Sequence, residues 1–186
     1  MVEVHVEICK GENILVSDIK RIDKILQKAF SGNEPIRPKN RKLFSKDTFF
    51  IVRGSQNRIL SIGRLRPAKI VFHGVSYSIL GIADIVSVVK RKGYGKMLME
   101  SMHSYMLAKK QKGIGFCLRK NSIFYRKSGL KIAKGLVNRF FYRTTNGETV
   151  KNKWDKDVIY TPNASDIIKE IRKHTKEKVR IMCPFW

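Results

Sequence analysis

Acidic residues are scarce in this chain of 186 residues. It has 15 Asp and Glu residues against 39 Lys and Arg, which gives a formal net charge of +24. A charge of this size predicts polyanionic partners: an acidic protein, a ribonucleoprotein, nucleic acid or a phosphorylated cofactor. Adaptation to the ion content of the host, or simple solubility, is the alternative explanation. The same charge disfavours polycationic substrates, because the surface would repel them.

Cysteine and long apolar runs are also lacking. Cys9, Cys117 and Cys183 are far apart and form no CxxC pair, so neither a disulfide framework nor a zinc site is predicted. The four histidines are scattered along the chain, and no metal site is expected. No run approaches the roughly 20 apolar residues of a membrane span. The alternating, acid-bearing N-terminal stretch is not typical of a signal peptide, and we expect a cytoplasmic protein without membrane contact.

Hydrophobic periodicity predicts a mixed α/β domain. Ile19, Ile22 and Leu26 share one face of an amphipathic helix near the N-terminus. Three apolar runs separated by short turns predict an antiparallel meander, interrupted at Pro67. The expected order is a strand (2–8), that helix, the meander (48–53, 59–72 and 75–88), a helix (94–110), a strand (114–118), a short helix (121–128), two strands (139–144 and 158–161) and a C-terminal helix from residue 165.

Residues 82–98 join an apolar, β-branched run to three cations, two glycines and a helical pattern. A strand that leads into a basic glycine turn at a helix N-terminus is a device for holding phosphate. Backbone N–H groups face the anion, and glycine lets the backbone approach closely because it has no Cβ. For the run of cations alone, a solvated turn is the alternative interpretation.

The motif Lys90-Arg91-Lys92-Gly93-Tyr94-Gly95 resembles the acyl-CoA signature of the GNAT superfamily of N-acetyltransferases, (Arg/Gln)-x-x-Gly-x-(Gly/Ala). About 25 residues later, Phe124-Tyr125-Arg126-Lys127-Ser128-Gly129-Leu130 resembles the second signature of that family. The resemblance covers residues 2–161. The chain departs from the family pattern at two positions. Lys90 stands where the family prefers Arg or Gln; lysine keeps the positive charge but lacks the planar, bidentate donor geometry of arginine. Ser87 stands where Pro is common at the end of the strand. The meander and the compact link from Cys117 to Tyr125 are most similar to the aminoglycoside 2′-N-acetyltransferase-like branch.

This resemblance implies a GNAT-like α/β (α+β) fold: a mixed, mostly antiparallel central sheet, flanked by helices and splayed between its fourth and fifth main strands. Residues 1–162 would form the acetyltransferase domain, and residues 163–186 a C-terminal helix and tail packed on the same domain. Acetyl-CoA would be the cosubstrate, entering at the splay, with no metal. The implied cofactor contacts are Ile85, Val86, Ser87, Lys90, Arg91, Lys92, Gly93, Tyr94, Gly95, Lys96, Asn121 and Lys127.

These contacts would have different roles. The backbone of residues 85–87 would pair with the pantetheine amides, and the N–H groups of residues 91–96 would surround the pyrophosphate. Lys90 and its neighbours would add positive charge. Arg126 or Lys127 could reach the 3′-phosphate. Asn121 has the alternative role of a helix cap.

Two residues are candidates for catalysis. Tyr125 occupies the position where the family keeps a general acid, and its phenol could protonate the CoA sulfur; the alternative is a core tyrosine. Asp84 interrupts an otherwise apolar strand, and a carboxylate there needs partners or a function. Either Asp84 takes the proton of the amine through water, or it is hydrogen-bonded structurally.

The function that follows is transfer of an acetyl group from acetyl-CoA to a primary amine of an unidentified protein or small molecule. The charge favours an acidic protein or a ribonucleoprotein as the acceptor. The alternative is a basic RNA- or ribosome-binding module on a GNAT scaffold, with weak or lost catalysis. A homodimer is a further expectation, since many members of the family dimerise.

Overall fold

The computed structural model of the chain describes residues 4–30, 35–143 and 149–183. They divide into two compact units, and the long strands β3 (Arg58–Phe72) and β4 (Val75–Ser87) contribute to both. Unit 1 comprises Met1–Arg66 and Ala83–Met102, and unit 2 comprises Pro67–Ile82 and His103–Trp186. Among the described residues, no helix combines the length and apolar character that crossing a bilayer requires.

Unit 1 packs one helix against a sheet. Its strands pair in the order β1–β2–β3–β4, and the β1–β2 and β2–β3 pairs are antiparallel. Ile19, Ile22 and Leu26 of α1 are buried against Phe49 and Ile51 of the sheet, so the predicted apolar face is confirmed. Besides parts of β3 and β4, the unit contains β1 (His5–Lys10), η1 (Gly11–Asn13), α1 (Val16–Ala29), η2 (Pro38–Leu43), β2 (Thr48–Gly54), η3 (Ser55–Asn57) and the start of α2 (Tyr94–Ala108).

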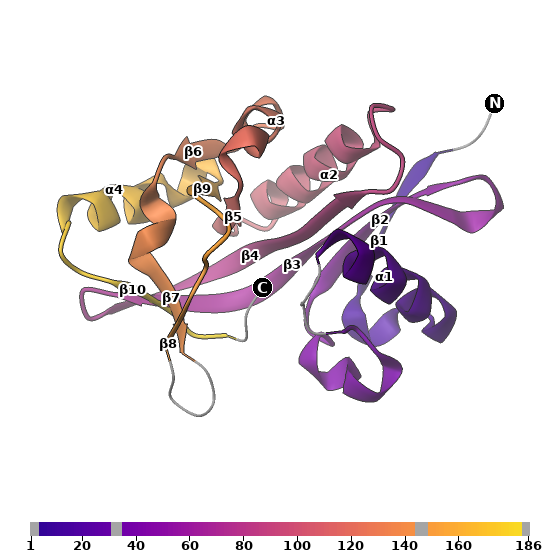
Figure 1. The fold of residues 1–186 in the computed structure, drawn as a ribbon, viewed down its shortest axis with the longest axis horizontal. Helices are drawn as coiled ribbons and strands as arrows, with labels where there is room; N and C mark the ends of the chain where they lie inside the picture. The colour runs from indigo at the N-terminus through magenta and orange to yellow at the C-terminus, as the bar shows by residue number, and fades with distance from the viewer. Residues whose placement is uncertain (1–3, 31–34, 144–148, 184–186) are drawn as a thin grey trace. The chain divides into compact units, whose positions relative to one another are not determined.

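Unit 2 contains the remaining strands, in the order β6–β9–β5–β4–β3–β10–β7–β8 (Figure 1). The β4–β5 and β10–β7 pairs are parallel, whereas β3–β10, β5–β9, β6–β9 and β7–β8 are antiparallel. The new elements are β5 (Gly113–Cys117), η4 (Arg119–Asn121), α3 (Ser122–Lys127), β6 (Lys131–Ala133), η5 (Leu136–Arg139), β7 (Phe140–Arg143), β8 (Thr149–Lys151), β9 (Asp157–Tyr160), η6 (Pro162–Ala164), α4 (Ser165–Lys173) and β10 (Val179–Ile181).

The core of unit 2 includes the predicted C-terminal helix. Ile167, Ile168 and Ile171 of α4 are buried together with Phe140 and Val179, and fully burying each such side chain contributes about 1.5–3 kcal/mol. The division into residues 1–162 and 163–186 stays a prediction. The expected fold class, a mixed and mostly antiparallel sheet flanked by helices, is confirmed.

The structure differs from the expected elements in several places. The short strands β6 and β8 are absent from the expected order. β3 continues through the exposed Pro67 without interruption. Val179–Ile181, which the sequence predicts as part of the C-terminal tail, form a strand, β10, between β3 and β7. The parallel ladder between β4 and β5 covers Leu80–Ile82, and β4 continues beyond it to Ser87.

Candidate active site

The turn that follows β4 holds the predicted phosphate-binding residues in unit 1. The N–H groups of Val88 and Val89 donate to the carbonyl oxygen of Leu60 (2.9 and 3.5 Å), so the turn begins at a fixed point on β3. Arg91 (φ +58°) and Gly93 (φ +83°) then adopt the left-handed conformation. This conformation is easy for glycine and costly for other residues. It redirects the chain, and α2 starts at Tyr94.

The first turn of α2 is suited to an anion. The Met97 N–H donates to the carbonyl of Gly93 (3.0 Å), and the N–H groups before it have no acceptor within the helix. No acidic residue lies in this turn, so no carboxylate of the turn itself competes with a bound anion for the positive end of the helix dipole. A Cβ built on Gly93 would have no atom within 4 Å. The space that the missing side chain leaves is open to a ligand.

Positively charged residues flank Gly93 in the sequence on both sides. The four charged side chains predicted to lie near the pyrophosphate are exposed; they are Lys90, Arg91, Lys92 and Lys96. Lys96 Nζ is also 3.6 Å from Glu100 Oε1, a solvent-exposed pair of a kind that contributes at most about 0.5 kcal/mol. Its charge is thus free to turn toward a phosphate. Tyr94 and Gly95 are half-buried at the start of the helix.

The last residues of β4 are the predicted partners of pantetheine. The Ser61 hydroxyl donates to the carbonyl of Val86 (2.8 Å) and is 3.1 Å from the Ser87 hydroxyl. A Cβ on Gly63 would lie 2.6 Å from Ile85 Cδ1, so that glycine makes room for Ile85. These contacts fix the end of β4.

Asp84 is held by a buried group of charges. Arg64 Nε lies 2.5 Å from Asp84 Oδ2, and the side chains are 9% and 6% exposed. Arg64 also contacts Asp47 (3.0 Å), which in turn contacts Arg66 (3.0 Å). Burial raises the pKa of Asp47, and the two guanidinium groups counteract it. Sequence reasoning missed Asp47, Arg64 and Arg66, although two arginines two residues apart in a strand point to one face.

The backbone at Asp84 is unusual as well. Its φ of +54° lies in the left-handed region, which is uncommon for a residue with a Cβ and marks a local break in the pleat. Arg64 Nε and Asp84 Oδ2 have no hydrogen-bond partner in the described part of the chain, so they form an ion pair outside hydrogen-bond geometry. The ion pair with Arg64 is a partner for the buried carboxylate, and both alternatives for Asp84, a base and a structural residue, stay predictions.

Tyr125 lies in unit 2, on the short helix α3. Its side chain is buried, and its ring packs edge-on against Phe124 with centroids 5.1 Å apart. Burial raises the pKa of the phenol above its ordinary value near 10. The hydroxyl therefore keeps its proton throughout the physiological range, as a proton donor requires.

The other predicted residues of unit 2 are exposed. Asn121 occupies the N-cap position of α3, but its side chain makes no capping hydrogen bond. Asn121 is thus a helix cap by position but not by a side-chain hydrogen bond, and its role as a cofactor contact stays a prediction. Lys127 lies at the exposed C-terminal end of α3, next to the exposed Arg126.

The start of α3 is fixed by a buried carboxylate, Asp157 of β9. The Ser122 hydroxyl (2.9 Å) and the Gly135 N–H (2.9 Å) donate to it, and Arg119 is 3.8 Å away. Burial opposes the charge of Asp157, but these groups outweigh it and lower the pKa of the carboxyl. Asp157 thus holds α3, and with it Tyr125, against β9.

We expect Asp157→Asn to reduce the free energy of unfolding at neutral pH by about 1.5–3 kcal/mol, the contribution of a hydrogen bond to a charged group. Because the folded-state pKa is lowered, the stabilisation by Asp157 is complete above the unfolded-state pKa near 3.9 and is lost as the pH falls below it. Urea denaturation between pH 7 and pH 3 measures this. The difference between wild type and variant should shrink with falling pH, and a constant difference would contradict the assignment.

Comparisons with known proteins identify the fold. No protein-family model and no curated protein sequence matches this chain. The structure is similar to Escherichia coli ElaA, with a TM-score of 0.61 and 8% identity over 86% of this chain and 99% of that one. It is similar to an acyl-CoA N-acyltransferase from Pseudomonas aeruginosa, with a TM-score of 0.57 and 12% identity over 84% and 99% of the two chains.

A third similar structure is that of the GNAT-family N-acetyltransferase YhbS of Escherichia coli in complex with CoA. Its TM-score is 0.56, with 12% identity over 97% of this chain and 89% of that one. The fold is therefore that of the GNAT N-acetyltransferases. The expectation of an aminoglycoside 2′-N-acetyltransferase-like branch stays a prediction.

Proposed function

We propose that this protein is an acyl-CoA-dependent N-acyltransferase that transfers an acetyl group from acetyl-CoA to a primary amine. The observation that carries the proposal is the basic turn at the start of α2. Gly93 has a φ of +83° and open space where a Cβ would be, and it stands between exposed cations on a GNAT fold. One structure with this fold, YhbS, is in complex with CoA.

The residues at the turn fit a pyrophosphate. The free N–H groups of residues 94–96 point along the axis of α2, and the helix dipole adds partial positive charge there. Lys90, Arg91, Lys92 and Lys96 supply full charges, which suits a cosubstrate with several negative charges. The backbone of residues 85–87 would pair with the pantetheine amides, and Arg126 or Lys127 would reach the 3′-phosphate. Asn121 would be a further contact to the cofactor.

Transfer forms a C–N bond between the acyl carbon and the amine nitrogen and breaks the C–S bond to CoA. The amine loses a proton and the departing sulfur gains one. Tyr125 would donate that proton, and the raised pKa of its phenol keeps the proton in place until it is needed. Asp84 could accept the proton of the amine through water if its pairing with Arg64 opens, and otherwise the proton passes to solvent.

Calorimetric titration with acetyl-CoA at fixed moderate salt tests the proposal. We expect saturable binding at one site per chain, followed by CoA release when a primary amine acceptor is added. A panel of acidic peptides and ribosomal proteins is the first set of acceptors, because the net charge of +24 favours acidic partners. A folded protein that binds neither acetyl-CoA nor CoA would refute the transferase function.

A second candidate function, binding of RNA, is favoured by a groove in unit 1. The groove has a volume of about 460 Å³ and is lined by Arg21, Lys24, Ile25, Lys28, Gln56, Arg58 and Ile59. Cations form its rim and two isoleucines its apolar floor. None of these seven lining residues is acidic, although Arg21 is also 3.8 Å from the buried Asp18. Such a surface suits a phosphate backbone whose bases contact the apolar floor.

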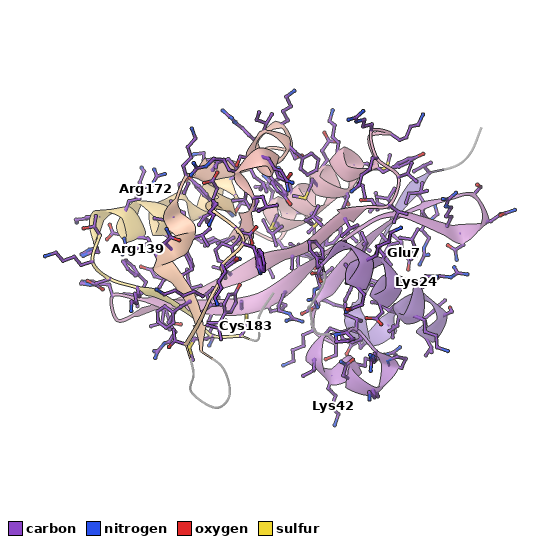
Figure 2. The ribbon with its side chains drawn as sticks, viewed as in Figure 1. Glu7, Lys24, Lys42, Arg139, Arg172 and Cys183 are labelled. Atoms are coloured by element: carbon purple, nitrogen blue, oxygen red, sulfur yellow. The ribbon has the colours of Figure 1, made fainter. Side chains whose placement is uncertain are left out.

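We expect the charge-reversal pair Lys24→Glu and Lys28→Glu to weaken binding of a labelled single-stranded RNA. Each lost phosphate contact should reduce the slope of log K against log salt by about 0.7, which fluorescence anisotropy at several salt concentrations measures. Lys42→Glu is the control, since Lys42 is exposed on η2 and is not one of the seven lining residues. Figure 2 labels both Lys42 and Lys24. Equal effects from Lys42→Glu, or no binding at physiological salt, would contradict this function.

A further inference from the structure

Two of the histidines that are scattered in the sequence meet in unit 2. The rings of His73 and His174 stack with centroids 4.3 Å apart and planes 27° apart. His73 Nδ1 is 2.8 Å from Glu177 Oε1, and His174 Nδ1 is 3.7 Å from the same oxygen. One potential ligand atom from each of the three residues lies within 4.8 Å of the others. The sequence predicted no metal site because the histidines are scattered along the chain. The contact between His73 and His174 shows that distance in the sequence does not keep these two histidines apart.

Strand pairing explains why these segments meet. β10 pairs antiparallel with the end of β3, with Arg180 opposite Val71 and Ile181 opposite Ile70. Continued toward the start of β10, this register places the residues before Val179 opposite the β3–β4 turn. His73 (φ +50°) and Gly74 (φ +73°) form that turn, and Glu177 precedes β10. The donors thus come from two segments that the sheet holds side by side.

The backbone that carries His174 and Glu177 is also fixed. Arg139 Nε donates to the carbonyl of Glu177 (2.6 Å), and its Nη atoms donate to the carbonyls of Ile171 (3.2 Å) and His174 (2.5 Å). Arg139 lies beside the end of α4 and is labelled in Figure 2. One guanidinium group therefore anchors the backbone at both potential ligands. Preorganisation of this kind reduces the cost of ordering a binding site.

Glu170 contacts the other ring nitrogen of His174. Its Oε2 is 3.5 Å from Nε2 of His174, one helical turn away. A proton on Nε2 directs the Nδ1 lone pair of His174 toward Glu177 and His73. A carboxylate that orients a metal-binding histidine through its other nitrogen is the usual second partner of such ligands.

We propose that His73, His174 and Glu177 form a binding site for a divalent transition metal of the zinc class, which links the β3–β4 turn to the connection between α4 and β10. Two imidazoles and one carboxylate are a common zinc ligand set that leaves a fourth position for water. Shifts of about 1 Å in the exposed His73 and the half-buried His174 and Glu177 bring donors that lie within 4.8 Å of one another to the spacing that zinc requires. Calcium and magnesium are not expected to bind, because they take oxygen ligands.

The charge around the site sets its selectivity. Lys173, Lys176 and Lys178 are exposed in the same segment and repel any cation. A metal that binds there must gain most of its energy from imidazole nitrogen, which favours zinc, nickel or copper over harder ions. This inference is independent of the proposed acyltransferase function.

Calorimetry of the untagged full chain with Zn²⁺ at pH 7.5 is the test. We expect one Zn²⁺ per chain, a rise in melting temperature on zinc addition, and no binding of Mg²⁺ or Ca²⁺ at millimolar concentration. His73→Asn and His174→Asn should each weaken zinc binding at least tenfold and abolish the rise in melting temperature. Glu170→Gln should weaken binding by about 10- to 100-fold.

His5→Asn is the matched control, because His5 is an exposed histidine at the other end of the chain, in β1. It should leave zinc binding unchanged. Melting temperatures in the presence of a chelator show whether each variant is folded. Substitution with Co²⁺ gives a second readout, since tetrahedral coordination by nitrogen and oxygen produces visible absorption bands that His174→Asn should remove. The proposal is overturned if zinc does not bind, or if His73→Asn and His174→Asn bind it as the wild type does.

Discussion

Tyr125→Phe is expected to lower the rate of acyl transfer by about 10²- to 10⁴-fold, the contribution of a positioned general acid. The variant keeps the ring and its edge contact with Phe124 but has no proton to give to the departing sulfur. The KM for acetyl-CoA should change little, because the phenol acts on the leaving group and not on the bound phosphates. Steady-state kinetics with the amine that gives the highest rate in the acceptor panel measures both values.

Tyr160→Phe is the matched control for this change. Tyr160 lies in β9 of the same unit, and like Tyr125 its side chain is 8% exposed. Removal of its hydroxyl therefore tests the general cost of losing a buried phenol. We expect Tyr160→Phe to keep most of the activity. Similar losses in the two variants would mean that Tyr125 is a core tyrosine, which is the alternative left open by the sequence.

The pH dependence provides a separate check on Tyr125. Burial raises the pKa of its phenol above the ordinary value near 10, so the protonated form persists to higher pH than for an exposed tyrosine. The rate should therefore not fall between pH 8 and pH 10 through loss of this proton. A fall in that range that disappears in Tyr125→Phe would contradict the assignment.

Local patterns in the sequence were sufficient for the elements that depend on them. The face of α1 formed by Ile19, Ile22 and Leu26 is buried as its 3.6-residue spacing predicts. The glycine turn before α2 is present with the positive φ that Gly93 makes possible. These features depend on residues that are close together in the sequence, so they can be predicted without the tertiary structure.

Features that depend on distant residues could not be predicted in the same way. β10 has three residues, and it is a strand because β3 and β7 flank it. A segment of three residues is too short for its strand propensity to predict a strand. His73 and Glu177 are in contact although 104 residues separate them in the chain. The partner of Asp84 is likewise Arg64 on the neighbouring strand, and one sequence does not specify which cation a buried carboxylate will meet.

Gly93→Asp should reduce the affinity for acetyl-CoA by about 100-fold or more. The new carboxylate would lie near the pyrophosphate, and two like charges about 5 Å apart repel by about 3 kcal/mol at an effective dielectric constant of 20, which corresponds to a factor above 100. The protein should remain folded, because the added side chain has no atom within 4 Å to displace. Calorimetric titration at fixed salt measures the change.

Two further variants separate charge from backbone strain. Gly93→Asn has nearly the same size and the same φ requirement, and Asn tolerates the left-handed region as Asp does, so its smaller loss of affinity gives the cost of strain alone. Gly74→Asp makes the same charge change at a glycine with a φ of +73° and open surroundings, in the β3–β4 turn of unit 2. We expect its acetyl-CoA affinity to equal that of the wild type. If Gly74→Asp weakens binding as much as Gly93→Asp does, the cosubstrate responds to net charge alone, and the turn before α2 is not its phosphate site.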